Sequence, residues 1–211
     1  MRALILSNGQ EPGNELLLKE AAKSDIIICA DGAAKWADEK GIKIDCIVGD
    51  FDSIHINLAQ EIATKHDAQI LKLPQIKDMT DTKVCIEIAK EKGADEISLL
   101  GALGKRIDHS IANIELLVYC RRIGMHGKII DEACEIDVSC VDLEFEGKKG
   151  DIVSLFPYGV NVKVKKTHNL AYPLENHNLQ LGQALGVSNV LTEDYAKVEI
   201  ANGWLIGIIN R

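Results

Sequence analysis

The first part of the chain alternates between short apolar runs and amphipathic segments. The runs are rich in Ile, Val and Cys and nearly free of polar residues, as expected of strands that are buried on both faces. The segments between them repeat apolar residues at helical spacing, and several end near Gly. The pattern predicts strands near residues 3–6, 26–29, 46–48, 69–73, 97–100 and 127–130, and helices near residues 15–22, 33–40, 57–65, 80–92 and 108–120.

Strands that alternate with helices favour an open parallel sheet with helices on both faces, joined by right-handed crossovers. After about residue 132 the pattern changes. Valine alternates with polar residues over 160–164, which is the period of a strand with one buried face. Asn202-Gly203 lies between two apolar stretches and predicts a two-residue hairpin turn. We therefore expect an α/β domain over residues 1–132 and a smaller all-β domain of short antiparallel strands over residues 133–211.

The composition is that of an ordinary globular protein, with 46% hydrophobic and 27% charged residues. A formal net charge of -8 disfavours a nucleic-acid binder, which usually carries a basic face. The apolar run after Met1 is too short for a signal peptide and no run is long enough to span a bilayer, so we expect a cytoplasmic protein without a membrane partner. None of the six cysteines forms a Cys-x-x-Cys pair, which favours buried reduced thiols over a zinc site.

Acidic and glycine-rich segments follow several predicted strands. Asp31 follows the second strand, the segment 49–53 follows the third, and the segment 101–109 follows the fifth. In open α/β sheets, ligands bind outside the carboxyl ends of the strands, which meet at one edge. The sequence therefore predicts that these segments share one site.

Asp50 and Asp52 are the clearest candidates at this edge. In an extended segment, residues two apart point the same way, so both carboxylates would lie on one side. Two carboxylates make a hard oxygen site that suits magnesium carrying phosphates, and Gly49 would let the backbone bend or a phosphate approach. A solvated acidic turn is the alternative for an isolated Asp-x-Asp, but the position directly after a buried strand favours the metal site.

Three further carboxylates each have two interpretations. Asp31 either joins the site or caps the following helix. Asp78 and Asp81 lie near the start of the helix 80–92, where the helix dipole favours carboxylates, and Asp81 is also a candidate third metal ligand. Thr80 is the expected cap of this helix.

The segment 101–109 is the second candidate element of the site. Its glycines would let the backbone approach a ligand, and Arg106 offers a planar fork for phosphate. Asp108 is the predicted cap of a helix whose N-terminal amides favour anions, and His109 lies in its first turn. The alternatives are a plain helix cap for Asp108, a surface charge for Arg106 and a solvated side chain for His109.

Several common nucleotide and hydrolase signatures are missing from the sequence. The chain has no P-loop, no Gly-x-Gly-x-x-Gly fingerprint and no Gly-x-Ser-x-Gly elbow. Ordinary P-loop kinases, NAD dehydrogenases and α/β-hydrolases are therefore disfavoured.

Taken in order, several segments form a pattern that is more specific than any one of them. The segments are 31–34, 49–54, 77–81 and 106–109 in the first domain, and 169–174 and 188–189 in the second. This ordered set resembles the thiamin pyrophosphokinase family, and the similarity covers nearly the whole chain.

The resemblance implies an N-terminal α/β domain that binds ATP and magnesium and a C-terminal β-sandwich that binds thiamin. It implies transfer of pyrophosphate from ATP to the hydroxyl of thiamin, with release of AMP. ATP would be the co-substrate and Mg²⁺ the cofactor. The resemblance also implies a homodimer whose site is built between the subunits.

The resemblance assigns roles to individual residues. The catalytic residues would be Asp50, Asp52, Asp81 and Asp108, of which the first three would hold magnesium. The residues that would bind ATP or orient the substrate are Asp31, Lys77, Asp78, Lys105, Arg106 and His109. The residues that would border thiamin are Tyr172, whose ring would stack on the thiamin rings, Ser188 and Asn189.

The chain departs from the family pattern at Ala33, Lys105 and Asn169, where the family usually has glycine. The first two lie near the predicted nucleotide region, and the third affects the loop beside Tyr172. Other interpretations stay open from the sequence: pyrophosphate transfer to another hydroxymethyl heterocycle such as a pterin, a nucleotide-sensing or thiamin-binding module without turnover, and a haloacid-dehalogenase-type phosphatase with an aspartyl nucleophile.

Overall fold

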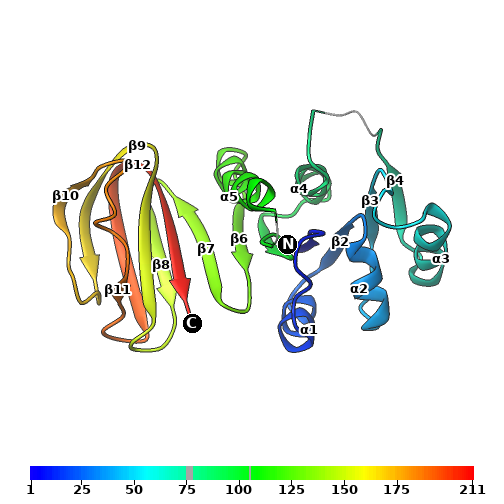
Figure 1. Cartoon of the computed structure of the whole chain (residues 1–211), viewed down its shortest axis with the longest axis horizontal. Helices are drawn as coiled ribbons and strands as arrows, with labels where there is room; N and C mark the ends of the chain where they lie inside the picture. The colour runs from blue at the N-terminus through cyan, green and yellow to red at the C-terminus, as the bar shows by residue number, and fades with distance from the viewer. Residues whose placement is uncertain (75–77, 105) are drawn as a thin grey trace. The chain divides into compact units, whose positions relative to one another are not determined.

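The computed structural model describes residues 1–74, 78–104 and 106–211 (Figure 1). The chain divides into two compact units, Met1–Glu132 and Ala133–Arg211. Two of the predicted site residues, Lys77 and Lys105, lie outside the described residues.

A parallel sheet forms the centre of the first unit. Its strands follow the order β6-β5-β1-β2-β3-β4 in space, and each paired neighbour runs parallel, which confirms the predicted fold class for this part of the chain. Strands β2 and β3 are buried at every position, as their uninterrupted apolar sequences require. The strands are β1 (Arg2–Leu6), β2 (Ile26–Ala30), β3 (Cys46–Gly49), β4 (Gln69–Lys72), β5 (Glu96–Leu100) and β6 (His126–Ile130).

Helices cover both faces of this sheet (Figure 1). On one face, Leu17, Ala34 and Ile62 from three helices pack with Leu4 and Ile47 of the sheet in one apolar cluster. The strand order reverses between β1 and β5, which makes this the point where ligands bind in open α/β sheets. The helices are α1 (Asn14–Ala22), α2 (Ala33–Glu39), α3 (Ile56–His66), α4 (Asp81–Glu91) and α5 (Ile107–Arg122).

Two predicted helix caps have different outcomes. Thr80 caps α4, because its side chain accepts a hydrogen bond from the backbone N–H of Lys83, as predicted. The prediction for Asp108 is wrong: the N-cap position of α5 lies two residues earlier, at Arg106, whose side chain forms no cap hydrogen bond. The Asp108 carboxylate bonds to the guanidinium of Arg106 instead.

The second unit is antiparallel and is organised around two long strands. β9 (Ile152–His168) pairs with β12 (Tyr195–Asn210) over almost its whole length. One half of this pair is extended by β8 (Asp142–Glu146) and β10 (Glu175–Leu179), and the other by β7 (Cys134–Ser139) and β11 (Asn189–Val190). Both halves contribute to one apolar core, whose residues include Leu143, Val153, Val164, Leu179 and Leu205.

The predicted hairpin at Asn202-Gly203 is wrong. β12 passes through this dipeptide and stays paired with β9 on both sides, with shifts of register at that point. Gly203 has φ +86°, and the Asn202 side chain accepts a hydrogen bond from the backbone N–H of Lys163. Residues that suit a tight turn also suit a bulge, which bends a strand without reversing it.

Four cysteines are buried, namely Cys29, Cys46, Cys85 and Cys120, whereas Cys140 is exposed. Burial raises the pKa of the Cys120 thiol to about 12, so this group stays protonated and packs as an apolar side chain. None of the described helices is both long and apolar enough to cross a membrane.

Candidate active site

A cavity of about 760 Å³ opens at the carboxyl edge of the parallel sheet in the first unit. Its walls come from the loops after β1, β2, β3 and β5 and from the first turns of α4 and α5. The cavity therefore lies where the strand order reverses. Six predicted site residues line it: Asp31, Asp50, Asp52, Asp81, Arg106 and His109.

Asp31, Asp50 and Asp52 form the acidic centre of this cavity. Each offers a carboxylate oxygen within 4.8 Å of the others. The expected reason for the convergence of Asp50 and Asp52 is wrong, because the segment is not extended. Phe51 adopts a left-handed conformation with φ +62°, and the Asp50 carboxylate accepts a hydrogen bond of 3.3 Å from the backbone N–H of Asp52. A tight turn therefore brings the two acids together.

Asp31 is buried, with an exposed fraction of 3%. Its Oδ2 accepts a hydrogen bond of 3.1 Å from the backbone N–H of Ser53, whereas its Oδ1 is buried and has no hydrogen-bond partner among the described residues. Burial raises the pKa of Asp31, and the neighbouring Asp52 acts in the same direction. The alternative prediction, that Asp31 caps α2, is wrong, because Gly32 holds that position without a side-chain bond.

Gly49 has a different role from the one its position suggested. A Cβ atom at this residue would lie 3.0 Å from the Cβ and 3.1 Å from the Cα of Asp31. The absence of a side chain at Gly49 makes room for Asp31 between two neighbouring strands. Gly49 therefore leaves free the space that the Asp31 side chain occupies in the acidic centre.

The residues of the acidic centre fit a hard cation. They provide three carboxylates on one cavity wall, one of which has a buried oxygen that no donor among the described residues satisfies. An unpaired buried carboxylate is costly unless a cation compensates it. Asp81 lines the same cavity from the first turn of α4 but lies outside the 4.8 Å cluster, and Asp78 is exposed and does not line the cavity.

Arg106 and Asp108 form an exposed bidentate pair at the cavity mouth. The Nε and Nη2 atoms of Arg106 donate to the two Asp108 oxygens at 3.2 and 2.6 Å. Their hydrogen bonds raise the pKa of Arg106 and lower that of Asp108. Arg106 lines the cavity, whereas Asp108 does not. An exposed pair is weak, so a phosphate could compete for the guanidinium.

The loop after β1 is a further part of the cavity, to which no role was assigned from the sequence. The backbone N–H groups of Gly9 and Gln10 donate to the carbonyls of Gly101 and Leu103, both at 2.9 Å. Gly9 has no side chain, and a Cβ there would lie 2.4 Å from the Gly101 carbonyl oxygen. The rule that ligands bind after the strands would have identified this segment, because Ser7-Asn8-Gly9 directly follows β1.

The residues predicted to border thiamin lie in the second unit. Tyr172 is exposed over 67% of its surface, and Asn189 is buried. Ser188 has φ +61°, and its backbone N–H donates to the Ser154 hydroxyl at 3.2 Å. Asn169 has φ +59°, so asparagine here adopts the left-handed conformation for which glycine is common.

An open parallel sheet with a carboxylate cluster at its switch point, followed by an antiparallel β unit, defines the class as a two-part α/β protein whose acidic cluster fits a hard cation. Comparisons with known proteins identify the family within this class. Residues 17–128 match the family model "Thiamin pyrophosphokinase, catalytic domain", and residues 139–205 match "Thiamin pyrophosphokinase, vitamin B1 binding domain". This chain belongs to the thiamin pyrophosphokinase family.

Individual relatives agree with the family models. The thiamine pyrophosphokinase of Bacillus subtilis is 31% identical over 164 residues, which cover 76% of this chain and 75% of that protein. Thiamine pyrophosphokinase 1 of Oryza sativa is 25% identical over 236 residues, covering 99% and 88%. The crystal structure of the Bacillus subtilis protein superposes with a TM-score of 0.86 at 25% identity and covers 100% of this chain and 99% of that one. The structure from Geobacillus thermodenitrificans has a TM-score of 0.85 at 24% identity, with coverage of 100% and 98%.

Proposed function

We propose that this chain transfers pyrophosphate from ATP to the hydroxyl of thiamin, which yields thiamin pyrophosphate and AMP. One observation carries the proposal: the catalytic-domain match contains a cavity with three converging carboxylates at the switch point of the sheet. The match to a vitamin B1 binding domain in the second unit supports thiamin as the acceptor.

The acidic centre is the proposed magnesium site. Asp31, Asp50 and Asp52 would hold the ion, and Asp81, which lines the same cavity, stays the predicted further ligand. Bound magnesium supplies charge neutralisation of the triphosphate at this edge of the sheet. Such a counterion would also offset the mutual repulsion of the three carboxylates.

The triphosphate would contact the cationic and helical parts of the cavity. Arg106 would exchange Asp108 for a phosphate, since a bidentate guanidinium suits either partner. His109 lies beside it in the first turn of α5, whose N-terminal amides favour anions. Lys77, Asp78 and Lys105 stay predicted nucleotide or substrate contacts.

The chemistry follows from positioning and charge stabilisation. The thiamin hydroxyl oxygen forms a bond to the β-phosphorus in line with the bond that breaks, and AMP leaves with the bridging oxygen. Two groups are proposed acceptors of the hydroxyl proton: Asp108, beside the cavity-lining Arg106, or a carboxylate of the acidic centre. The Asp108 carboxylate is ionised beside Arg106, and transfer of Arg106 to a phosphate would remove the partner that lowers the pKa of Asp108.

The second unit is the proposed thiamin-binding domain, with residues 1–132 as the catalytic domain. The exposed ring of Tyr172 would stack on the cationic rings of thiamin, bordered by Ser188 and Asn189. The proposed assembly is a homodimer in which the second unit of one subunit serves the first unit of its partner. The family resemblance supports this arrangement, and the cytoplasm stays the predicted location.

The test is the identity of the nucleotide product. The purified protein is incubated with ATP, MgCl₂ and thiamin, and nucleotides and thiamin esters are separated by chromatography. AMP and thiamin pyrophosphate in equal amounts are the expected result. ADP would contradict pyrophosphate transfer, and inorganic phosphate alone would indicate a phosphatase. A parallel reaction with a hydroxymethyl pterin tests the choice of acceptor.

A further inference from the structure

Tyr172 combines an exposed side chain with a fixed backbone. Its exposed fraction of 67% would suit a mobile loop tip. Its backbone N–H and C=O groups are nevertheless both hydrogen-bonded, and both bonds go to one side chain, that of Asn189. The Tyr172 ring is therefore exposed to solvent, while its backbone is held by hydrogen bonds.

The Asn189 side chain supplies the two backbone hydrogen bonds that a neighbouring strand would otherwise supply to Tyr172. Its Oδ1 accepts hydrogen bonds from the N–H groups of Tyr172 and Val190, both at 2.9 Å, and its Nδ2 donates to the Tyr172 carbonyl at 2.7 Å. The residue is only 5% exposed, so its amide is committed to the protein backbone. One side-chain oxygen and one side-chain nitrogen thereby satisfy both polar groups of Tyr172.

The two flanks of the loop are fixed independently of Asn189. On the near side, Leu170 is buried and forms an isolated bridge with Leu191. On the far side, the Leu174 N–H donates to the Thr167 hydroxyl at 2.8 Å, and the Thr167 N–H donates to the Leu174 carbonyl at 3.0 Å. Only the centre of the loop, at Tyr172, depends on the Asn189 amide.

We infer that Asn189, which the family resemblance places at the border of the thiamin site, acts there as a positioning residue: its amide orders Tyr172 as a preformed platform for the cationic ring system of the acceptor and bonds to the protein rather than to that acceptor. The inference rests on the proposed function. A ring that is ordered before binding loses less conformational entropy when a ligand stacks on it. A tyrosine face attracts a cationic heterocycle most strongly when its distance and tilt are fixed.

The first test needs no ligand. Amide hydrogen exchange is measured by NMR on the full chain and on Asn189→Ala. The Tyr172 amide should exchange roughly tenfold faster in the variant, as expected for the loss of one hydrogen bond, while the Leu174 amide is unchanged. The matched control is Asn202→Ala, which also removes a side-chain bond to a backbone N–H in the second unit but at a different strand pair. Unchanged exchange at Tyr172 would overturn the inference.

The second test is a double-mutant cycle in turnover. Asn189→Ala should raise the KM for thiamin about tenfold and leave kcat and the KM for ATP within about twofold. In a Tyr172→Ala background the same substitution should have no further effect, because the platform is already absent. Effects that multiply would show that Asn189 contacts the acceptor directly and would overturn the inference.

A variant that fails to fold would be replaced by Asn189→Gln. Glutamine keeps an uncharged amide but displaces it by one methylene group from the N–H and C=O groups of Tyr172, whereas aspartate would place a second carboxylate oxygen against the Tyr172 carbonyl. The same exchange and cycle measurements then apply, with the same direction of change. If wild-type protein makes no thiamin pyrophosphate, the proposed function fails, while the exchange measurement still decides whether Asn189 orders Tyr172.

Discussion

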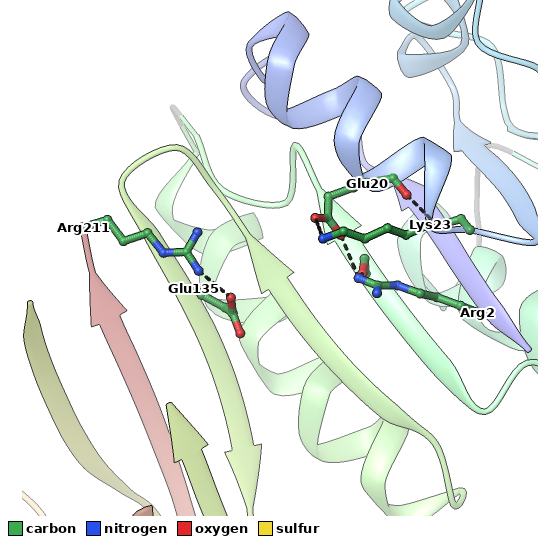
Figure 2. A network of polar contacts seen from close by, with 7 residues as sticks. Arg2, Glu20, Lys23, Glu135 and Arg211 are labelled. Carbon is green, nitrogen blue, oxygen red and sulfur yellow. Dashed lines mark hydrogen bonds and ion pairs between the residues drawn. The ribbon is translucent and has the colours of Figure 1, made fainter. Parts of the chain in front are cut away.

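Buried carboxylates at the two edges of the parallel sheet in the first unit have opposite surroundings: cationic side chains at one edge and other carboxylates at the other. At the amino edge, Glu20 is 2% exposed, and its two oxygens pair with Arg2 at 2.7 Å and Lys23 at 2.6 Å (Figure 2). Arg2 also donates to the Ser98 hydroxyl at 2.8 Å. At the carboxyl edge, Asp31 is equally buried but lies against two other acids, with one oxygen that no described residue satisfies.

This difference separates a carboxylate that the chain itself pairs with cations from one that has an oxygen without a partner among the described residues. At the amino edge, both oxygens of Glu20 are paired with cationic side chains of the same chain. The Asp31 cluster keeps like charges together, which costs stability unless a cation binds. The three predictions below test whether residues at the carboxyl edge affect turnover more than stability, and whether Glu20 at the amino edge affects stability and not turnover.

The largest expected effect is at Asp52. Asp52→Asn removes one carboxylate of the acidic centre and should lower the rate of thiamin pyrophosphate formation by at least about 100-fold, because charge stabilisation of the triphosphate is lost. The melting temperature in EDTA should stay equal or rise, since a repulsion is relieved. Rates come from the chromatographic assay, and the control is Asp67→Asn at the exposed C-cap of α3, which does not line the cavity. Near-normal turnover would remove Asp52 from the metal site.

Glu20→Gln tests the opposite edge. Loss of this buried charge leaves Arg2 and Lys23 without their partner and should lower the free energy of unfolding by about 2 kcal/mol. The cost is below that of a fully buried pair because the two cationic side chains are 29% and 43% exposed. The kcat/KM values should not change.

Urea denaturation measures the stability of Glu20→Gln, and Glu39→Gln serves as its control. Glu39 forms an exposed pair with Lys35 at 3.6 Å, which contributes less than about 0.5 kcal/mol. A loss of activity in Glu20→Gln at full folding would show that the amino edge is not purely structural.

Gly49→Ala tests how the acidic centre is shaped. The added methyl group would meet Asp31 at 3.0 Å and displace it, so activity should fall about tenfold, with a stability loss of about 1 kcal/mol. Gly41→Ala is the control: its φ of +67° makes the substitution similarly costly, although nothing lies within 4 Å of it. Equal activity in both variants would mean that the position of Asp31 is not critical.

Local patterns predicted much of the fold and part of the site. The buried strands follow from uninterrupted apolar runs such as Ile26–Ala30, and α4 follows from Thr80 and the stripe behind it. The placement of Asp50 and Asp52 after β3 identified the cavity edge. By contrast, Asn202-Gly203 has the same local preference in a bulge and in a hairpin, and only the pairing of β12 with β9 decides between them.

The sequence by itself determined the alternation of strands and helices and the position of acids at strand ends, because both depend on periodicity over a few residues. Tertiary structure alone decided that Asp31 joins Asp50 and Asp52. The convergence of these carboxylates depends on the pairing of β2 with β3 and on the space that the missing side chain of Gly49 leaves for Asp31. Tertiary structure also decided that Asn189 turns its amide toward Tyr172, seventeen residues away in the chain. Contacts between distant segments depend on register and packing, which no local pattern specifies.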